Sequence, residues 1–369
     1  MNYFIIAGEA SGDLHGARLI QALQEKDSQA NFKFWGGDLM AAQAPGGLIT
    51  HYRENAIMGF VEVVMNLGKI KKNFAACKQA ILNFKPDVVI LIDYPGFNLR
   101  MAEFCKKQGI KTVYFIAPKV WAWKENRAKQ LEKNVDLLLL IFPFEVDYFK
   151  KWKINTRYVG NPLLDEIADF ISHKPIEISA ANKPLLALLP GSRKQELAKM
   201  LPIMLQTLKR FPEFDAVICG APGLDASAYQ PYLSDGVKLE FGKTYEIVSK
   251  ATAALVCSGT ATLETALLGI PQVCGYKANP ISMRIAKLLV KVKFISLVNL
   301  NLNRAAIPEL IQEDFNPEQV EMELRALMPG GEKHDQLLQD YQELKTVFGT
   351  TGADKRAADA VLELLCTKG

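Results

Sequence analysis

The stretch YFIIAGEASGD, residues 3–13, decides the fold, because an apolar run of strand length meets a glycine-rich turn. Apolar residues at helical spacing follow over Leu14–Lys26. A Val- and Ile-rich strand at Asp87–Ile92 precedes a helix at Leu99–Gln108, and a further strand follows at Leu185–Leu189. Such alternation predicts parallel sheets with helices on both faces. We therefore expect an α/β protein of two Rossmann-like domains that face each other across a cleft.

The length of 369 residues supports two domains, at about 100 to 200 residues for each. A polar, proline-containing stretch at 172–183 marks the change from one to the other. The expected divisions are 1–170 for the first domain, 171–345 for the second, and 346–369 for a C-terminal helical segment.

Composition excludes several classes of protein. Hydrophobic residues make up 49% and charged residues 23%, which is a globular balance, and a net charge of +4 argues against a nucleic-acid partner. The six cysteines form no CxxC pair and the four histidines are scattered, so we expect no zinc framework, no other resident metal and no cofactor. The N-terminus lacks a signal-peptide pattern, and the longest apolar run, at 137–144, is too short to span a membrane. These features predict a cytoplasmic protein.

Ligands of doubly wound sheets bind at the carboxyl ends of the strands, so the turn after the first strand is a candidate site. Gly8 and Gly12 permit close approach of a ligand, and the amides around Ser11 favour an anion or a polar group. Glu9 adds a carboxylate with no evident structural duty. The alternative is a tight turn in which Ser11 or Asp13 caps the helix.

Asp93 follows the buried run VVILI at the end of another strand. Partial desolvation there would raise its pKa and suit it to act as a general base. The alternative is an Asp that caps the turn formed with Pro95 and Gly96. Because Glu9 and Asp93 belong to the same rim of one sheet, we favour a catalytic pair.

Two loops of the second domain have the chemistry of a diphosphate site. In LPGSR (189–193), Gly191 and Ser192 offer backbone amides at a helix start and Arg193 adds a cation, unless Arg193 is simply solvated. In SGTATLE the amides, hydroxyls and carboxylate come from Ser258, Gly259, Thr260, Thr262 and Glu264. Glu264 suits ribose hydroxyls, or it is the partner of a helix cap.

The segment 57–74 is apolar and carries three lysines, which fits a membrane surface or an acyl-chain contact. An amphipathic core helix with lysines along its edge has the same pattern, and from this segment alone we favour that alternative. The residues assigned to that contact are Met58, Phe60, Val61, Val64, Met65, Lys69, Lys71 and Lys72.

A series of motifs then gives a family resemblance. They run in order as AGEASGD (7–13), MGFVEV (58–63), IDYPGFN (92–98), PKVWAW (118–123), FPFE (142–145), VGNPL (159–163), LPGSR (189–193), SGTATLE (258–264) and PELIQED (308–314). The chain resembles the lipid-A-disaccharide synthases, inverting glycosyltransferases with two Rossmann-like domains, the GT-B fold. The resemblance implies transfer of 2,3-diacylglucosamine from UDP-2,3-diacylglucosamine to lipid X, which is 2,3-diacylglucosamine 1-phosphate. The products are the β-1',6-linked lipid A disaccharide 1-phosphate and UDP.

The same resemblance implies a metal-independent peripheral protein on the anionic inner face of the cytoplasmic membrane. It assigns lipid and acceptor binding to the first domain and UDP-sugar binding to the second, with Asp93 as the better candidate for the base beside Glu9. Arg193 and the SGTA loop fall at the diphosphate. Asn299, Glu309 and Gln312 match positions near the nucleotide. The C-terminal helix is expected to cross back to the first domain and to exchange between the subunits of a homodimer.

One stretch departs from the family pattern. Where the family has a small, glycine-containing stretch, this chain reads NLNRAA (301–306), which puts the roles of Asn303 and Arg304 in doubt. Two other functions share the architecture, a UDP-sugar epimerase and a non-catalytic nucleotide-sugar binding protein. The paired carboxylates argue against the latter, since a nucleotide binder does not need them.

Overall fold

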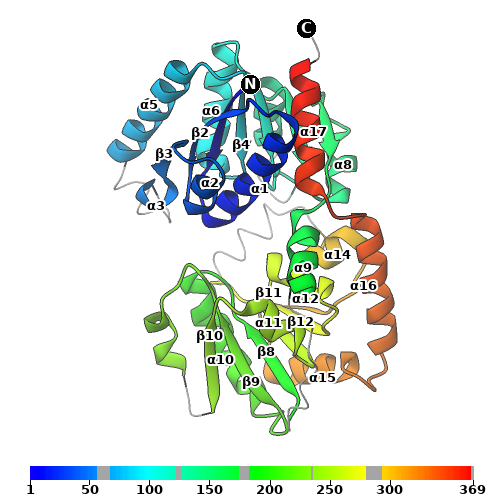
Figure 1. Ribbon diagram of the computed structural model, residues 1–369. Helices are drawn as coiled ribbons and strands as arrows, with labels where there is room; N and C mark the ends of the chain where they lie inside the picture. The colour runs from blue at the N-terminus through cyan, green and yellow to red at the C-terminus, as the bar shows by residue number, and fades with distance from the viewer. Residues whose placement is uncertain (56–66, 122–125, 174–182, 234–235, 280–292, 367–369) are drawn as a thin grey trace. The chain divides into compact units, whose positions relative to one another are not determined.

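The computed structural model describes residues 1–55, 67–121, 126–173, 183–233, 236–279 and 293–366. The chain forms two compact units, Met1–Pro162 with Thr350–Gly369, and Leu163–Gly349 (Figure 1). Each unit is a parallel sheet covered by helices, so the predicted α/β class with two Rossmann-like domains is confirmed.

The first unit contains a seven-stranded sheet of order β3-β2-β1-β4-β5-β6-β7. Its strands are β1 (Asn2–Ala7), β2 (Asn31–Gly36), β3 (Leu48–His51), β4 (Val88–Ile92), β5 (Lys111–Phe115), β6 (Leu137–Leu140) and β7 (Thr156–Tyr158). Its helices are α1 (Ala10–Lys26), α2 (Asp38–Gln43), α3 (Tyr52–Asn55), α5 (Leu67–Phe84), α6 (Pro95–Lys107), α7 (Asn126–Asn134), α8 (Pro143–Phe149) and α17 (Ala353–Cys366).

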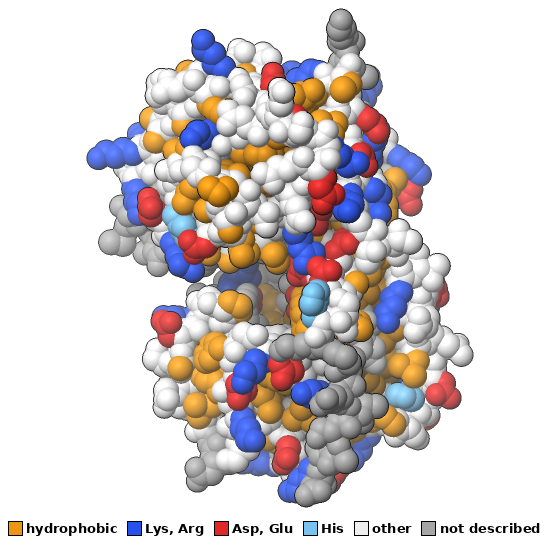
Figure 2. Space-filling model, viewed as in Figure 1, with side chains coloured by type: hydrophobic (Ala, Val, Ile, Leu, Met, Phe, Trp, Pro, Cys, Tyr) orange, Lys and Arg blue, Asp and Glu red, His pale blue; other side chains and the backbone are white. Residues whose placement is uncertain are grey.

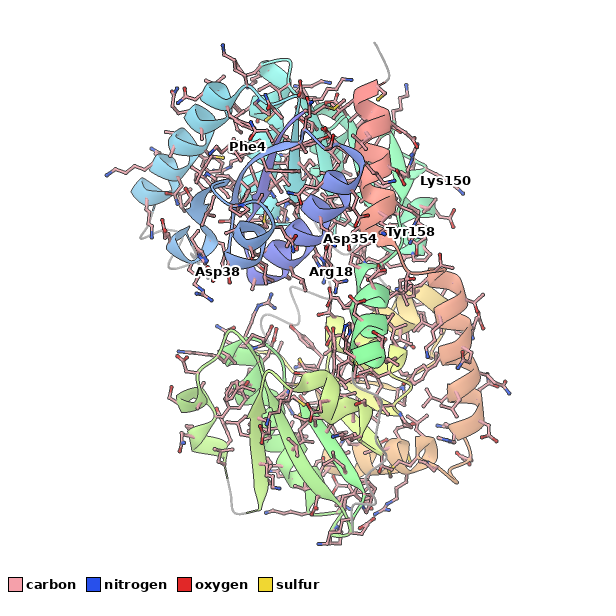
Figure 3. The ribbon with its side chains drawn as sticks, viewed as in Figure 1. Phe4, Arg18, Asp38, Lys150, Tyr158 and Asp354 are labelled. Atoms are coloured by element: carbon pink, nitrogen blue, oxygen red, sulfur yellow. The ribbon has the colours of Figure 1, made fainter. Side chains whose placement is uncertain are left out.

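Central strands of this sheet are apolar along their whole length because both faces are covered. Phe4 and Ile6 of β1 point to one face, where they join a core with Cys77 of α5 and Met101 of α6, and Figure 3 labels Phe4 in this core. On α17, Ala357 and Val361 are fully buried, and this helix packs against α1, with Lys26 pairing to Asp359 at 2.6 Å. The first and last helices of the chain therefore complete one domain.

The second unit has a six-stranded sheet of order β10-β9-β8-β11-β12-β13. Its strands are β8 (Leu185–Leu189), β9 (Asp215–Gly220), β10 (Val237–Phe241), β11 (Ala253–Cys257), β12 (Gln272–Tyr276) and β13 (Glu309–Ile311). Its helices are α9 (Pro162–His173), α10 (Lys194–Leu208), η1 (Ala226–Ala228), η2 (Gln230–Tyr232), α11 (Thr244–Ser249), α12 (Thr260–Leu267), α14 (Leu297–Leu302), α15 (Pro317–Leu327) and α16 (His334–Phe348).

All pairs among the described strands are parallel, so the carboxyl ends of neighbouring strands meet at one edge of each sheet. In the first unit this edge carries Gly8 after β1 and Asp93 after β4. In the second it carries Gly191 after β8 and Ser258 after β11. Each candidate loop thus lies where its own sheet offers a binding edge.

Three further findings concern the charged surface, the cysteines and the helices. Figure 2 shows Lys and Arg side chains spread over this face of each unit and interspersed with Asp and Glu, in keeping with the small net charge. The six cysteines all lie in described ranges and are free; five are buried, and Cys366 is exposed. No helix in the described ranges is both long enough and apolar enough to cross a membrane.

Candidate active site

Asp93 lies in a strained turn that the surrounding protein holds in place. Asp93 and Tyr94 both adopt left-handed backbone angles, with φ of 42° and 49°, which non-glycine residues rarely do. The carbonyl oxygen of Asp93 accepts hydrogen bonds from the Tyr114 hydroxyl at 2.6 Å and from Asn98 Nδ2 at 2.8 Å. Its amide donates to the carbonyl of Phe115 at 3.0 Å. Strain that is stabilised in this way is typical of functional positions.

The electrostatic surroundings of Asp93 favour a proton acceptor. Its side chain is exposed at the sheet edge, yet the protein around it displaces enough water to raise the pKa of the carboxyl to about 6. The negative charge of Glu9 raises this pKa further, while Lys119 and a hydrogen bond from the Tyr94 amide oppose the rise. A carboxylate with this pKa is ionised at neutral pH and basic enough to accept a proton.

Glu9 and Ser11 are exposed at the beginning of α1. Glu9 is the N-cap residue, and within the described part of the chain its side chain makes no capping hydrogen bond. Of the two caps weighed from the sequence, Asp13 has another duty. It is buried, and its carboxylate accepts the amides of Gly37 at 2.7 Å and Leu39 at 3.0 Å, and so caps α2.

Close packing excludes a side chain at Gly8 and leaves little room for one at Gly12. A Cβ at Gly8 would overlap the ring of Tyr94, and one at Gly12 would lie 3.1 Å from the Cβ of Ala7. Gly8 therefore lets Tyr94, which follows Asp93, pack over the end of β1. The loops after β1 and β4 thus pack against each other, and they hold the predicted pair, Glu9 and Asp93, at the same edge of the sheet.

In the second unit Arg193 stands at the N-terminus of α10 with its side chain 79% exposed. Its guanidinium donates to Glu196 Oε1 at 2.8 Å. The other oxygen, Oε2, accepts the amides of Ser192 at 3.0 Å and Arg193 at 3.2 Å. Gly191 has a φ of 106°, and a Cβ there would lie 2.7 Å from Glu196 Oε2. Glu196, which sequence reasoning did not assign to the site, therefore occupies donors predicted to bind a diphosphate.

The SGTATLE loop begins α12. The Ser258 hydroxyl donates to the carbonyl of Ile295 at 2.8 Å, and the buried Thr262 hydroxyl donates to the carbonyl of Gly259 at 2.8 Å. Thr260, the first residue of the helix, is exposed. Burial raises the pKa of Glu264 to about 7, and the neighbouring Glu166 contributes to the rise. Glu264 is thus poised to be a hydrogen-bond donor or an acceptor near neutral pH.

Asn299 and Glu309 form a buried network rather than an open surface. Glu309 Oε1 accepts the Ser296 amide at 2.9 Å, the Ser296 hydroxyl at 2.7 Å and Asn299 Nδ2 at 2.9 Å. Asn299 is fully buried, and its Oδ1 accepts the amides of Ala306 at 2.8 Å and Ile307 at 2.9 Å. Together they fix the loop between α14 and β13.

Two neighbours of this network also bond to protein groups. Gln312 has a φ of 60°, and its side-chain oxygen accepts the Ala278 amide at 2.7 Å. In NLNRAA (301–306), the stretch that departs from the family pattern, Asn303 ends α14 with a left-handed φ of 52°. Arg304 pairs with Asp340 at 2.8 Å and with Glu343 of α16, which is a structural duty.

For the expected membrane segment the structure gives only part of the picture. Lys69, Lys71 and Lys72 are exposed in the first turns of α5. The other residues of that prediction lie outside the described residues, namely Met58, Phe60, Val61, Val64 and Met65. Over the described ranges no three His, Cys, Asp or Glu side chains come together as a metal site.

With this geometry established, comparison with known proteins decides the family. A family model described as lipid-A-disaccharide synthetase matches residues 3–362. The chain belongs to the lipid-A-disaccharide synthase family. A lipid-A-disaccharide synthase of Myxococcus xanthus is 36% identical over 372 residues, covering 98% of this chain and 97% of the relative. The enzyme of Syntrophus aciditrophicus is 36% identical, covering 98% of this chain and 97% of the relative. That of Nitrosococcus oceani is 34% identical, covering 98% of this chain and 95% of the relative.

Solved structures show the same fold at low identity. A UDP-GlcNAc 2-epimerase from Neisseria meningitidis, bound to UDP-GlcNAc, has a TM-score of 0.69 at 15% identity and covers 98% of this chain and 100% of its own. A calicheamicin glycosyltransferase has a TM-score of 0.60 at 14% identity, covering 99% and 98%. These likenesses support the GT-B fold, which both enzyme classes share. Membership of the lipid-A-disaccharide synthase family decides between them, so the chain is a glycosyltransferase of lipid A disaccharide synthesis.

Proposed function

We propose that the chain transfers 2,3-diacylglucosamine from its UDP donor to the 6-hydroxyl of lipid X with inversion, and that Asp93 is the general base. The family implies a UDP-sugar donor and a lipid acceptor. The assignment of the base rests on Asp93 at the end of β4, where hydrogen bonds hold its backbone and its carboxyl has a pKa raised to about 6, in part by the charge of Glu9. Glu9 keeps Asp93 basic and is a second partner for the hydroxyls of the acceptor.

In the proposed step Asp93 accepts the proton of the 6-hydroxyl while that oxygen forms a bond to the anomeric carbon of the donor. The bond from the anomeric carbon to the diphosphate breaks, and its electron pair leaves with UDP. A single displacement of this kind inverts the anomeric centre. The turn that clamps the backbone of Asp93 serves to orient the base.

The second unit is proposed to bind the leaving group. Arg193 supplies a permanent charge at the start of α10, and the first turn of α12 adds the Thr260 hydroxyl and helix amides. Because Glu196 accepts a hydrogen bond from the Arg193 guanidinium, a diphosphate bound there would compete with that carboxylate for the cation. Glu264 is proposed to hydrogen-bond the ribose hydroxyls.

Asn299, Glu309 and Gln312 are proposed to act as positioning residues for the nucleotide. Their side-chain atoms bond to the protein's own amides, carbonyls and side chains, so they hold loops at the edge of the second sheet. The nucleotide would meet the backbone of those loops rather than the side chains.

The test of the base is replacement of Asp93 by Asn, which keeps the shape and removes the basic oxygen. Disaccharide formation should fall about 100-fold or more with the fold intact by circular dichroism. Asp147→Asn is the matched control, because Asp147 is exposed on α8 and pairs only at the surface with Lys150, labelled in Figure 3. Near-normal turnover of Asp93→Asn would remove Asp93 from this role.

Attachment to the anionic inner face of the cytoplasmic membrane is also proposed, through the lysines at the start of α5 and the apolar residues before them. Each lysine near an anionic surface contributes about 1 kcal/mol, so replacing Lys69, Lys71 and Lys72 by Gln should weaken binding to phosphatidylglycerol vesicles roughly 100-fold. The triple variant Lys129, Lys133 and Lys209 to Gln is the control. Equal vesicle binding by both triple variants would contradict this placement.

A homodimer completes the proposal and rests on the family resemblance alone. Sedimentation of the purified chain at micromolar concentration should give twice the mass of 41.0 kDa. A single species at the monomer mass would refute it.

A further inference from the structure

The sheet edge that carries Asp93 also carries a lysine. β5 lies next to β4, and the Asp93 amide donates to the carbonyl of Phe115, the last residue of β5, at 3.0 Å. The loop after β5, residues 116–121, therefore begins beside Asp93. Lys119 belongs to this loop. The edge of the first sheet thus has a cation after β5, in addition to Glu9 after β1 and Asp93 after β4.

The loop after β5 has a fixed conformation in which Lys119 is exposed while Pro118 and Val120 on either side of it are buried. The Val120 amide donates to the Pro118 carbonyl at 2.6 Å, and the Val120 carbonyl accepts the Tyr148 hydroxyl at 3.3 Å. Ile116, at the start of the loop, has a φ of 66°, which a β-branched residue rarely adopts. Strain that the surrounding structure stabilises is typical of functional positions.

A buried carboxyl fixes the other end of this loop. Glu145 of α8 is 1% exposed, and its Oε1 accepts the indole N–H of Trp121 at 3.2 Å. Its Oε2 accepts the amide of Phe142, which follows β6, at 3.1 Å. Glu145 therefore connects the loop after β5 to the loop after β6. The backbone that carries Lys119 is held both where the loop leaves the sheet and at Trp121.

The charge of Lys119 is available to a ligand. Among the described residues its ammonium group forms no ion pair and donates no hydrogen bond. The charge nevertheless acts on two carboxyls. Displacement of water raises the pKa of Asp93 to about 6 and that of Glu145 to about 7, and Lys119 opposes the rise in each. The ammonium group therefore lies near the proposed base without contacting it.

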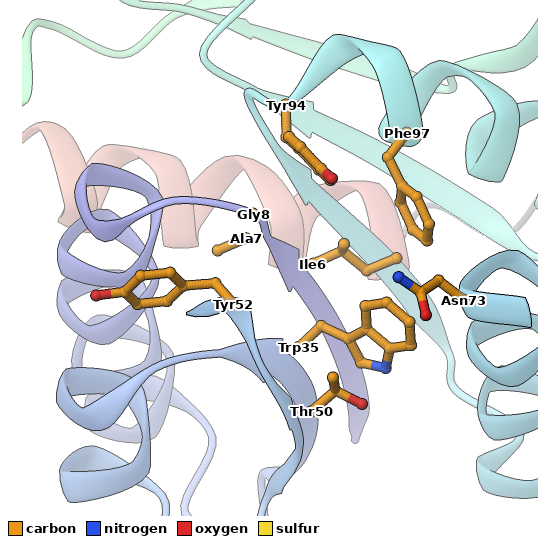
Figure 4. A pocket seen from close by; sticks show the side chains of 9 residues that line it. All are labelled: Ile6, Ala7, Gly8, Trp35, Thr50, Tyr52, Asn73, Tyr94 and Phe97. Carbon is orange, nitrogen blue, oxygen red and sulfur yellow. The ribbon is translucent and has the colours of Figure 1, made fainter. Parts of the chain in front are cut away.

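The pocket beside this edge does not suit a charged group. Figure 4 shows Tyr94 and Gly8 among its nine lining residues, none of which is charged, and its volume of about 20 Å³ has room for about one water molecule. An anionic group of a ligand must therefore lie on the open edge, where the carboxylates of Glu9 and Asp93 would repel it. A cation at the same edge offsets this repulsion, and among the described side chains Lys119 is the cation that acts on Asp93.

We infer that Lys119 binds the phosphate group of the acceptor. The inference rests on the proposed function, in which the acceptor is a sugar 1-phosphate that reacts through its 6-hydroxyl. C1, which bears the phosphate, and C5, which bears C6, both flank the ring oxygen, so the phosphate and the reacting hydroxyl are at the same end of the sugar ring. With the hydroxyl at Asp93, the phosphate comes close to the base without touching it, as the Lys119 charge does. Lys119 is then a specificity-determining residue that distinguishes a phosphorylated from an unphosphorylated acceptor.

The test measures acceptor binding with and without the charge of Lys119. The acceptor is 2,3-dihexanoylglucosamine 1-phosphate, and the same sugar without phosphate is a competing ligand whose inhibition constant can be measured whether or not it reacts. Lys119→Gln removes the charge and keeps most of the side-chain length. The KM of the phosphorylated acceptor should rise about tenfold, as expected for a hydrogen bond between charged groups. The inhibition constant of the unphosphorylated sugar and the KM of the donor should stay within about twofold.

Two further variants are controls. Lys133→Gln removes an exposed lysine of the same unit in the last turn of α7, next to the start of β6, and should leave all three constants unchanged. Lys119→Arg keeps the charge, and its KM for the phosphorylated acceptor should stay within about threefold of the wild-type value.

Three results would overturn the inference. The first is an unchanged KM in Lys119→Gln. The second is an equal loss of binding for the phosphorylated and the unphosphorylated sugar, because Lys119 would then act on the base or on the fold rather than on the phosphate. The third is a loss in Lys119→Arg as large as that in Lys119→Gln. Disaccharide formation by the wild type leaves the proposed function standing in each case, whereas its absence would refute the proposed function.

Discussion

Replacing Glu9 by Gln tests the electrostatic account of the base. The pKa of Asp93 is raised to about 6, first by the surrounding protein, which displaces water from the carboxyl, and then by the charge of Glu9. The base is active when ionised, so kcat/KM is full above this pKa and is lost as the pH falls through it. With a pKa of about 6, roughly one tenth of the carboxylates are ionised at pH 5, and kcat/KM there should be about a tenth of its plateau.

Glu9→Gln removes one of the two causes that raise the pKa of Asp93, so the acid limb of the profile must move to lower pH. The ratio of kcat/KM at pH 5 to its plateau should rise about twofold or more, even if the plateau itself falls through loss of an acceptor contact. The assay is the initial rate of UDP release at low acceptor concentration between pH 4.5 and 8.5. Glu103→Gln is the control, an exposed carboxylate paired with Lys107 towards the C-terminal end of α6.

Two results would refute this reasoning. One is a wild-type profile that stays nearly flat down to pH 4.5, as a carboxyl with the ordinary pKa of 3.8 would give, since Asp93 would then be an unperturbed carboxylate. The other is a Glu9→Gln profile that superimposes on the wild-type profile after scaling, because Glu9 would then have no influence on the base.

Three further predictions concern other parts of the two units. Arg193→Ala should lower kcat about 100-fold or more without changing the melting temperature, since the side chain is 79% exposed; an unchanged kcat would exclude it from the diphosphate site. Gly8→Ala should lower the free energy of unfolding of the first unit in urea by about 1 to 3 kcal/mol, because the new Cβ overlaps the ring of Tyr94. The double variant Gly8→Ala, Tyr94→Ala should lose less stability than the sum of the losses in the two single variants. A loss equal to that sum would argue against the overlap. Asn299→Ala should cost about 1 to 3 kcal/mol in the same measurement, because it leaves the amides of Ala306 and Ile307 without their acceptor; wild-type stability would mean that the loop does not need it.

Local pattern was enough to predict the strands that end at the candidate sites. The run VVILI before Asp93 is buried at every position, as expected of a central parallel strand. The pattern did not predict β2, because Lys33 interrupts the apolar run of NFKFWG and Gly36 ends it.

The roles of polar side chains were harder to foresee, because they depend on partners distant in sequence. Asp13 was one of two alternative caps weighed for α1, and its carboxylate instead caps α2, where it accepts the amide of Gly37, 24 residues along the chain. Glu309 was expected near a nucleotide, and its oxygens accept hydrogen bonds from Ile295, Ser296 and Asn299. Its role in positioning the nucleotide stays a prediction, as do the roles of Asp93, Glu9 and Arg193.

The most direct test of the proposed reaction is UDP release from UDP-2,3-diacylglucosamine in detergent micelles with EDTA present, measured with and without lipid X. The account predicts release that requires lipid X, is matched by formation of the disaccharide, and survives chelation of metal ions. Release in the absence of lipid X, or no release with it, would contradict the proposed transfer.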